Sequence, residues 1–124
     1  MAETRGMGEA LGVSIIVVNY NNDRFLAVAI DSALAQDHPL CEVIVVDDCS
    51  TDSSQELIGR YGDRIRSVLR ETNGGQTEAL KSAWPLARYP ILIFLDSDDR
   101  LLMHAAATVA ARWTAATVKV QFPS

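Results

Sequence analysis

ILIFLDSDD, residues 91–99, is an apolar run that ends abruptly in three aspartates and a serine. An uninterrupted run of this kind is typical of a strand buried on both faces of a sheet. In an open α/β sheet, ligands bind beyond the carboxyl ends of the strands. The stretch therefore predicts a buried strand over 91–95 that delivers polar side chains to a binding crevice.

The rest of the chain alternates strand-like and helix-like patterns. Residues 13–19 (VSIIVVN) and 42–46 (EVIVV) predict two more buried strands, 64–70 predicts an edge strand, and 118–122 predicts the start of a fifth strand. Apolar residues spaced by three and four predict helices over 23–35, over 53–61, around 79–87 with a kink at Pro85, and over 101–113. Ser53 and Glu56 have capping-box spacing, and Gly62 is expected to end that helix.

This alternation predicts the fold class. Strands that alternate with helices favour a three-layer α/β/α fold with a mainly parallel sheet and right-handed crossovers. Parallel strands point their carboxyl ends the same way, so three polar tips should meet at one edge. They are Asn19 to Asn22, Asp47-Asp48, and Asp96 to Asp99.

Length and composition limit the number of domains and the classes of partner and location that the sequence supports. A chain of 124 residues fits one domain, with 1–12 expected as a flexible leader and 13–124 as the domain. The net charge is −5, which argues against nucleic acid as a partner. No apolar run approaches the ~20 residues of a membrane span, and we expect a cytoplasmic location, with peripheral attachment to the inner membrane face left open. Cys41 and Cys49 flank one predicted strand, so we expect free thiols.

Five aspartates that converge on one crevice repel one another and require a cation or hydrogen-bond donors. Oxygen ligands beside a phosphate site suit Mg²⁺ or Mn²⁺. The alternative is that aspartates that follow the strands cap the next helices, which is also the role we expect for Asp52. Asp47 or Asp48 could accept hydrogen bonds from a base imide or a ribose, and Tyr20 either stacks on the base or belongs to the core.

Several common nucleotide and nucleophile motifs are absent from the sequence. No GxGxxG follows the first strand, and there is no GxxxxGK[ST] or GxSxG. Gly74-Gly75 before a helix is compatible with a backbone approach to phosphate, although two glycines alone are weak evidence. A haloacid-dehalogenase phosphatase also carries an Asp-x-Asp motif, but there the motif follows the first strand and continues to Thr or Val. Here the motif follows the fourth strand and continues to Asp99-Arg100.

Five segments, in this order and spacing, resemble the N-terminal half of family 2 glycosyltransferases. They are VSIIVVNYNN (13–22), AIDSALAQDHP (29–39), EVIVVDDCSTDSS (42–54), ETNGGQTEAL (71–80) and ILIFLDSDD (91–99). The resemblance covers about residues 13–102, and VKVQF (118–122) is also similar. It implies a Rossmann-like GT-A fold that is incomplete at its C-terminus.

The resemblance also implies roles for individual residues. Tyr20 matches the position that packs against the nucleobase, and Asp48 or Asp47 matches the carboxylate that reads it. Asp98 would be the principal metal ligand of a DxD motif, and Asp96 would contact ribose or the metal shell. The remaining nucleotide-sugar contacts expected from these segments are Asn19, Asn21, Asn73, Gly74 and Ser97.

The implied reaction is transfer of a sugar, with inversion, from a nucleotide-diphosphate sugar to an acceptor hydroxyl. A UDP-sugar is favoured as donor, and the acceptor is a polysaccharide, a lipid-linked glycan or a protein glycan. No segment resembles the one that carries the catalytic base, so no base is assigned, and it is expected beyond the C-terminus. The alternative is a truncated, catalytically silent nucleotide-binding module.

Overall fold

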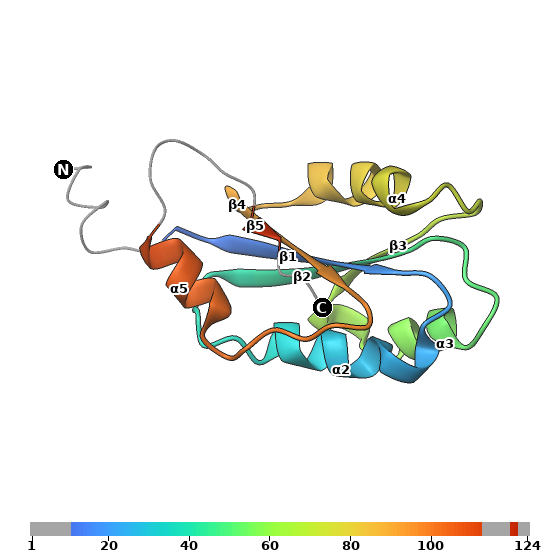
Figure 1. The fold of residues 1–124 in the computed structure, drawn as a ribbon, viewed down its shortest axis with the longest axis horizontal. Coiled ribbons are helices and arrows are strands. Elements are labelled where there is room, and N and C mark those ends of the chain that lie inside the picture. Colours follow the sequence, from blue (N-terminus) through green and yellow to red (C-terminus); the bar gives the residue numbers. More distant parts are fainter. Residues whose placement is uncertain (1–10, 113–119, 122–124) are drawn as a thin grey trace.

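The computed structural model describes residues 11–112 and 120–121, which include a five-stranded, fully parallel sheet in the order β3-β2-β1-β4-β5 (Figure 1). The strands are β1 (Val13–Asn19), β2 (Cys41–Asp47), β3 (Arg66–Leu69), β4 (Ile91–Asp96) and β5 (Val120–Gln121). The α-helices are α2 (Asp23–Leu34), α3 (Ser54–Gly59), α4 (Gln76–Ala83) and α5 (Ala105–Ala111), and two 3₁₀ turns are η1 (Gly62–Arg64) and η2 (Trp84–Leu86).

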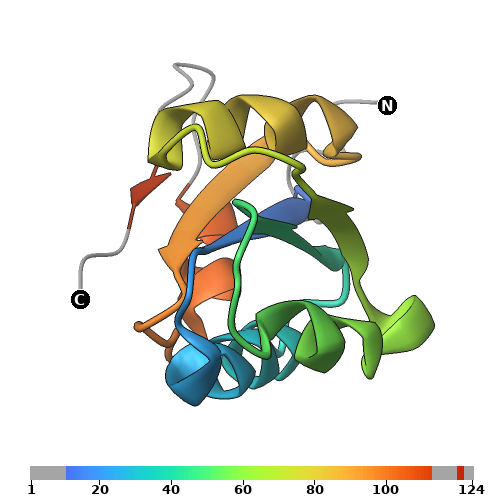
Figure 2. The ribbon, with the colours of Figure 1, turned by 90° about the vertical axis from the view of Figure 1, so that its right-hand side faces the viewer.

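The helices lie on both faces of the sheet, so the predicted three-layer arrangement is confirmed (Figures 1 and 2). Alternate residues of each strand point to opposite faces. Ile15 and Val17 of β1 belong to a core shared with α2, α3 and α5. Ile16 and Val18 belong to a second core, which α4 covers with Ala79 and other residues. A strand buried on both sides explains why β1 reads as a continuous apolar run.

The register of the central strand fixes the position of the polar tips. In the parallel pairing, Asn19 at the end of β1 lies opposite Asp47 at the end of β2. On the other side, Val18 lies opposite Asp96 at the end of β4. Both acidic tips therefore flank the carboxyl end of β1.

Two local predictions agree with the structure. Helix α4 ends at Ala83 and continues as the 3₁₀ turn η2 with Pro85 near its start, as expected for a residue that cannot donate a helical hydrogen bond. Cys41 and Cys49 are free thiols. Residues 1–10 of the expected leader, Trp113, and most of the predicted strand 118–122 lie outside the described residues.

Two other predictions were wrong. The last helix begins at Ala105 instead of residue 101, because the preceding segment is tied to α2: the Leu101 N–H donates to Ser32 Oγ. Ser53 and Glu56 form no capping box, since Ser53 makes no side-chain cap hydrogen bond. Instead, Asp52 accepts a hydrogen bond from the Ser54 N–H at 2.9 Å, as expected for a helix-capping aspartate.

The described helices contain no apolar stretch long enough to cross a bilayer.

We predict that α2 depends on its buried face for stability. Leu26 is fully buried, whereas Val28 on the same helix is 51% exposed. Leu26→Ala should lower the free energy of unfolding by about 2–5 kcal/mol, because it removes core contacts and leaves a cavity. Val28→Ala is the control and should change it by about 0.5 kcal/mol or less. Urea denaturation measures both, and equal effects would contradict this orientation of α2.

Candidate functional site

A cleft of about 310 Å³ opens at the carboxyl ends of β1, β2 and β4. It is lined by Val18, Tyr20, Asn22, Asp48, Asn73, Gly75, Gln76, Asp96, Ser97 and Asp98. The loop between β3 and α4 supplies one wall, through Asn73 and Gly75. The two acidic tips therefore meet in one cleft, as the strand ends predict.

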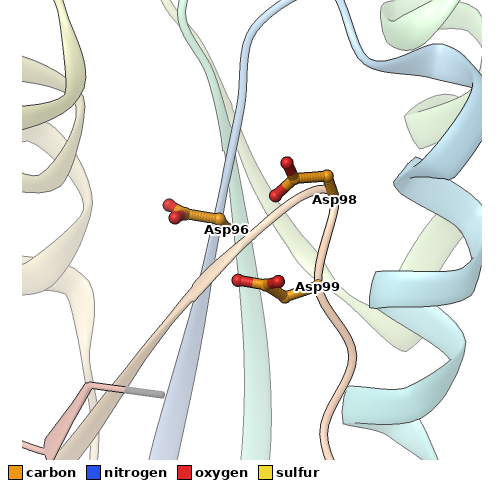
Figure 3. Close-up of side chains that lie close together, drawn as sticks. All are labelled: Asp96, Asp98 and Asp99. Atoms are coloured by element: carbon orange, nitrogen blue, oxygen red, sulfur yellow. The ribbon is translucent and has the colours of Figure 1, made fainter. Parts of the chain in front are cut away.

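Three carboxylates crowd together after β4. Asp96, Asp98 and Asp99 each offer an oxygen that lies within 4.8 Å of the others. Figure 3 shows Asp98 and Asp99 on the turn after the strand, with their carboxylates directed toward the side on which Asp96 lies. Burial, and then the charges of Asp99 and Asp98, raise the pKa of Asp96. The folded chain thus brings together like charges that disfavour ionisation.

Asp99 adds a second sign that this cluster suits a cation. Its side chain is 8% exposed, and its Oδ2 atom is buried without a hydrogen-bond partner. A buried polar atom without a partner is costly in a folded protein. A hard divalent ion, which prefers oxygen ligands, would satisfy Asp99 and offset the repulsion. The donor set therefore fits Mg²⁺ or Mn²⁺.

The negative charge of Asp48, on the other side of the cleft, is compensated by hydrogen-bond donors of the protein itself. Arg70 Nε donates to its Oδ1 at 2.8 Å, the Gly74 N–H to the same oxygen at 3.1 Å, and the Gly75 N–H to Oδ2 at 2.8 Å. Burial alone raises the pKa of Asp48, but the two amides and Arg70 outweigh it and hold the pKa below its ordinary value. Asp48 is thus a fixed, ionised carboxylate at the cleft wall.

Gly74 and Gly75 supply two of the three donors to Asp48, and the structure favours glycine at both positions. Gly75 is the N-cap of α4 with φ 91°, a left-handed conformation that favours glycine. A Cβ at Gly74 would lie 2.7 Å from Arg70 Nη2 and 2.9 Å from Glu78 Cβ. The sequence suggested that this pair approaches phosphate, whereas in the structure both N–H groups donate to Asp48.

Three of the predicted contact residues connect the loops and are not among those lining the cleft. Asn19 is fully buried, and its Nδ2 donates to Asp47 Oδ1 at 2.7 Å. Asp47 is also fully buried and accepts from the Ser50 N–H and hydroxyl. Asn21 has φ 52°, and its Oδ1 accepts from the Thr51 N–H at 2.8 Å. These residues join the β1–α2 and β2–α3 loops.

The other predicted contacts, except Gly74, line the cleft. Tyr20 is 45% exposed and lines it together with Asn73 and Ser97. Ser97 is buried, and its hydroxyl accepts from Asn22 Nδ2 at 3.1 Å. Gly74 reaches the cleft wall through Asp48. Neither His38 nor His104 is among the lining residues.

Sequence reasoning missed Arg70 and Gln76, and it gave no role to Asn22 and Asp99, which it placed only among the polar strand ends. Arg70 follows the edge strand β3, and its side chain reaches Asp48, which follows the neighbouring strand β2, so its charge was a usable signal. Asp99 was visible as the last acidic residue of its run. Gln76 follows a glycine pair, and the sequence gives no sign of its partner or of the partner of Asn22. Gln76 Nε2 donates to Asp96 Oδ1 at 2.6 Å.

The arrangement combines three chemical capacities. Tyr20 offers an exposed ring, Asp48 an ionised acceptor, and the cluster at Asp96 a set of oxygen atoms that fits a divalent cation. A planar base, a hydroxyl or imide donor, and a phosphate-bound metal ion would match them in turn.

Asp48→Asn should test how the β3–α4 wall is held. Loss of the charge weakens bonds from Arg70, Gly74 and Gly75, so the free energy of unfolding at pH 7 should fall by about 1–3 kcal/mol. Because the folded-state pKa is depressed below the ordinary 3.8, this stability is present above that pH and is lost as the pH falls through the folded-state pKa. Urea denaturation from pH 7 down to about pH 3 should show the two proteins converging. A gap independent of pH would contradict the assignment, and exposed Asp63→Asn is the control.

Comparison with known proteins supports a single family. The family model described as "Glycosyl transferase family 2" matches residues 14–121. The chain is 38% identical over 91 residues to the glycosyltransferase alr2836 of Nostoc, a match that covers 70% of this chain and 28% of that protein. It is 32% identical over 103 residues to the poly(ribitol-phosphate) β-N-acetylglucosaminyltransferase TarS of Staphylococcus aureus, covering 79% of this chain and 18% of TarS.

Solved structures agree with these relatives. The crystal structure of TarS residues 1–349 in complex with UDP superposes with a TM-score of 0.74 and 31% identity, over 81% of this chain and 31% of that one. The mannosyltransferase PcManGT of Pyrobaculum calidifontis has the same fold, with a TM-score of 0.74 at 23% identity over 90% of this chain and 38% of that one. The chain thus spans about a fifth to two fifths of the length of these proteins. The family match over residues 14–121, together with the parallel sheet and the cleft, shows that the chain belongs to glycosyl transferase family 2 and has the GT-A fold.

Proposed function

We propose that this chain forms the nucleotide-sugar-binding part of a metal-dependent, inverting glycosyltransferase. The observation that carries the proposal is one cleft, in a member of this family, that is lined by Asp48 and by Asp96 and Asp98 of the carboxylate cluster. TarS, which is 31% identical to this chain over the superposed region, was solved with UDP. A UDP-sugar is therefore the favoured donor.

In this proposal the nucleoside lies at the β2 side of the cleft. Tyr20 packs against the base. Asp48 accepts from the base or the ribose with acceptor capacity left after its three internal bonds, since an ionised carboxylate has about four acceptor sites. Asn73 and Ser97 lie along the path from the base to the diphosphate. Asn19, Asn21 and Asp47 act indirectly, by fixing the loops.

The diphosphate lies at the β4 side, where Asp98, Asp96 and Asp99 would hold Mg²⁺ or Mn²⁺. When bound, such an ion offsets the negative charge that builds on the departing nucleoside diphosphate. Asp98 is the exposed member of the cluster and faces the cleft, so we assign it as the principal ligand. Asp96 turns one oxygen to Gln76 and keeps the other for the ion or the ribose.

A second candidate function is nucleotide binding without catalysis. The matched relatives are about four to six times as long as the aligned segment, and no residue of this chain is assigned as the base that deprotonates the acceptor. Binding of the donor nucleotide without sugar transfer would favour this candidate. Both candidates require the same cleft and the same metal cluster.

Calorimetric titration with UDP, GDP and dTDP, each with and without Mn²⁺, tests the proposed binding. We expect nucleoside-diphosphate binding that Mn²⁺ strengthens, with UDP preferred. Asp98→Ala should abolish the Mn²⁺-dependent part, because it removes the principal oxygen ligand. Asp63→Ala, which removes an exposed carboxylate in η1, is the matched control and should bind like the wild type. Equal binding by wild type and Asp98→Ala would overturn the assigned site.

Asp99→Asn tests whether the buried carboxylate belongs to the metal site. Removing one of three crowded charges relieves repulsion, so the Tm without metal should stay the same or rise. The affinity for Mn²⁺ should fall about tenfold, which corresponds to ~1.4 kcal/mol, and the rise in Tm on adding Mn²⁺ should shrink. Thermal melts with and without Mn²⁺ measure both effects. A lower Tm without metal, with unchanged Mn²⁺ affinity, would assign Asp99 a structural role instead.

A further inference from the structure

The first residue of α4 reaches across the cleft to the metal cluster. Gln76 follows Gly75, whose N–H is bound to Asp48 Oδ2 at 2.8 Å. From there the Gln76 side chain extends to Asp96, where Nε2 lies 2.6 Å from Oδ1. One short segment thus bonds through its backbone to the β2 tip and through its side chain to the β4 tip.

This bond falls on one carboxylate of the crowded cluster. Asp96 has a carboxylate oxygen within 4.8 Å of oxygens of Asp98 and Asp99, so three negative charges crowd together there. The amide of Gln76 donates a hydrogen bond to this crowded carboxylate. It also restricts the rotation of the carboxylate, because a hydrogen bond on Oδ1 defines where Oδ2 points. An amide is neutral and therefore adds no competing charge to a cation site.

We propose that Gln76 is a positioning residue, which orients Asp96 for the divalent cation and connects the metal end of the cleft to the Asp48 wall. The inference rests on the proposed function and deepens it. Gln76 acts through Asp96 and is not itself a metal ligand. Its contribution should therefore appear in metal-dependent binding and be absent from metal-free binding.

The chain offers a matched control of the same chemistry. Gln55 Nε2 donates to Asp47 Oδ2 at 3.1 Å, so it also bridges a helix to a strand-end aspartate. Asp47 is fully buried, and neither Gln55 nor Asp47 is among the residues that line the cleft. Gln55→Leu and Gln76→Leu remove equivalent amide–carboxylate bonds, and only the second touches the metal cluster.

The experiment measures binding of Mn²⁺ alone, by the electron paramagnetic resonance signal of the free ion, and binding of UDP with and without Mn²⁺ by calorimetry. For Gln76→Leu we expect about five- to tenfold weaker binding of Mn²⁺ and of UDP with Mn²⁺, with metal-free UDP binding unchanged. Gln76→Asn, whose amide is one methylene too short to reach Asp96, should behave like Gln76→Leu. Gln55→Leu should leave all binding constants unchanged.

The outcomes separate this inference from the proposed function. If the wild type shows no Mn²⁺-dependent UDP binding, the proposed function fails and this inference fails with it. If the wild type binds and Gln76→Leu binds equally well, only the positioning role is overturned. An equal loss of UDP affinity with and without Mn²⁺ would make Gln76 a direct nucleotide contact and would also overturn the positioning role.

Discussion

The parallel pairing of β1 with β2 on one side and β4 on the other is the constraint on which the site depends. It places the ends of β2 and β4 on either side of one strand, so their aspartates are forced into proximity. The apolar core on both faces of β1 enforces the register, since a slip by one residue would turn buried side chains such as Ile15 and Ile16 to the wrong face. The hydrophobic effect thus holds together charges that would otherwise separate.

The protein treats its two acidic tips differently. Asp47 and Asp48 are satisfied by donors of the chain: Asn19, Ser50 and Gln55 for the first, and Arg70 with two backbone amides for the second. The cluster after β4 has one amide donor on Asp96 and a buried, unpartnered oxygen on Asp99. This asymmetry distinguishes an internal network whose carboxylates have donors from one that keeps a buried oxygen without a partner. It also explains why the binding of a cation is proposed at β4 and not at β2.

Much of this was predictable from the sequence, for a physical reason. Buried parallel strands produce long apolar runs, and a polar residue that ends such a run marks the ligand edge, so the strands, the layers and the cleft were all predictable. The roles of residues within the cleft were less predictable, because only the direction in which the chain turns after β2 distinguishes adjacent residues such as Asp47 and Asp48. The start of α5 was misplaced for a similar reason: the tie from Leu101 to Ser32 spans 69 residues and leaves no local pattern. Gln76 likewise owes its position to a partner twenty residues away.

The three donors on Asp48 have a consequence for how a ligand is received. An aspartate on a free loop loses rotamer freedom when it binds, and ordering a side chain in this way costs about 0.5–1.5 kcal/mol. Asp48 has already lost that freedom in the folded chain, because Arg70, Gly74 and Gly75 fix both of its oxygens. In the proposed function, the β2 side of the cleft is therefore preorganised, because the position of Asp48 is set when the chain folds and not when the ligand arrives.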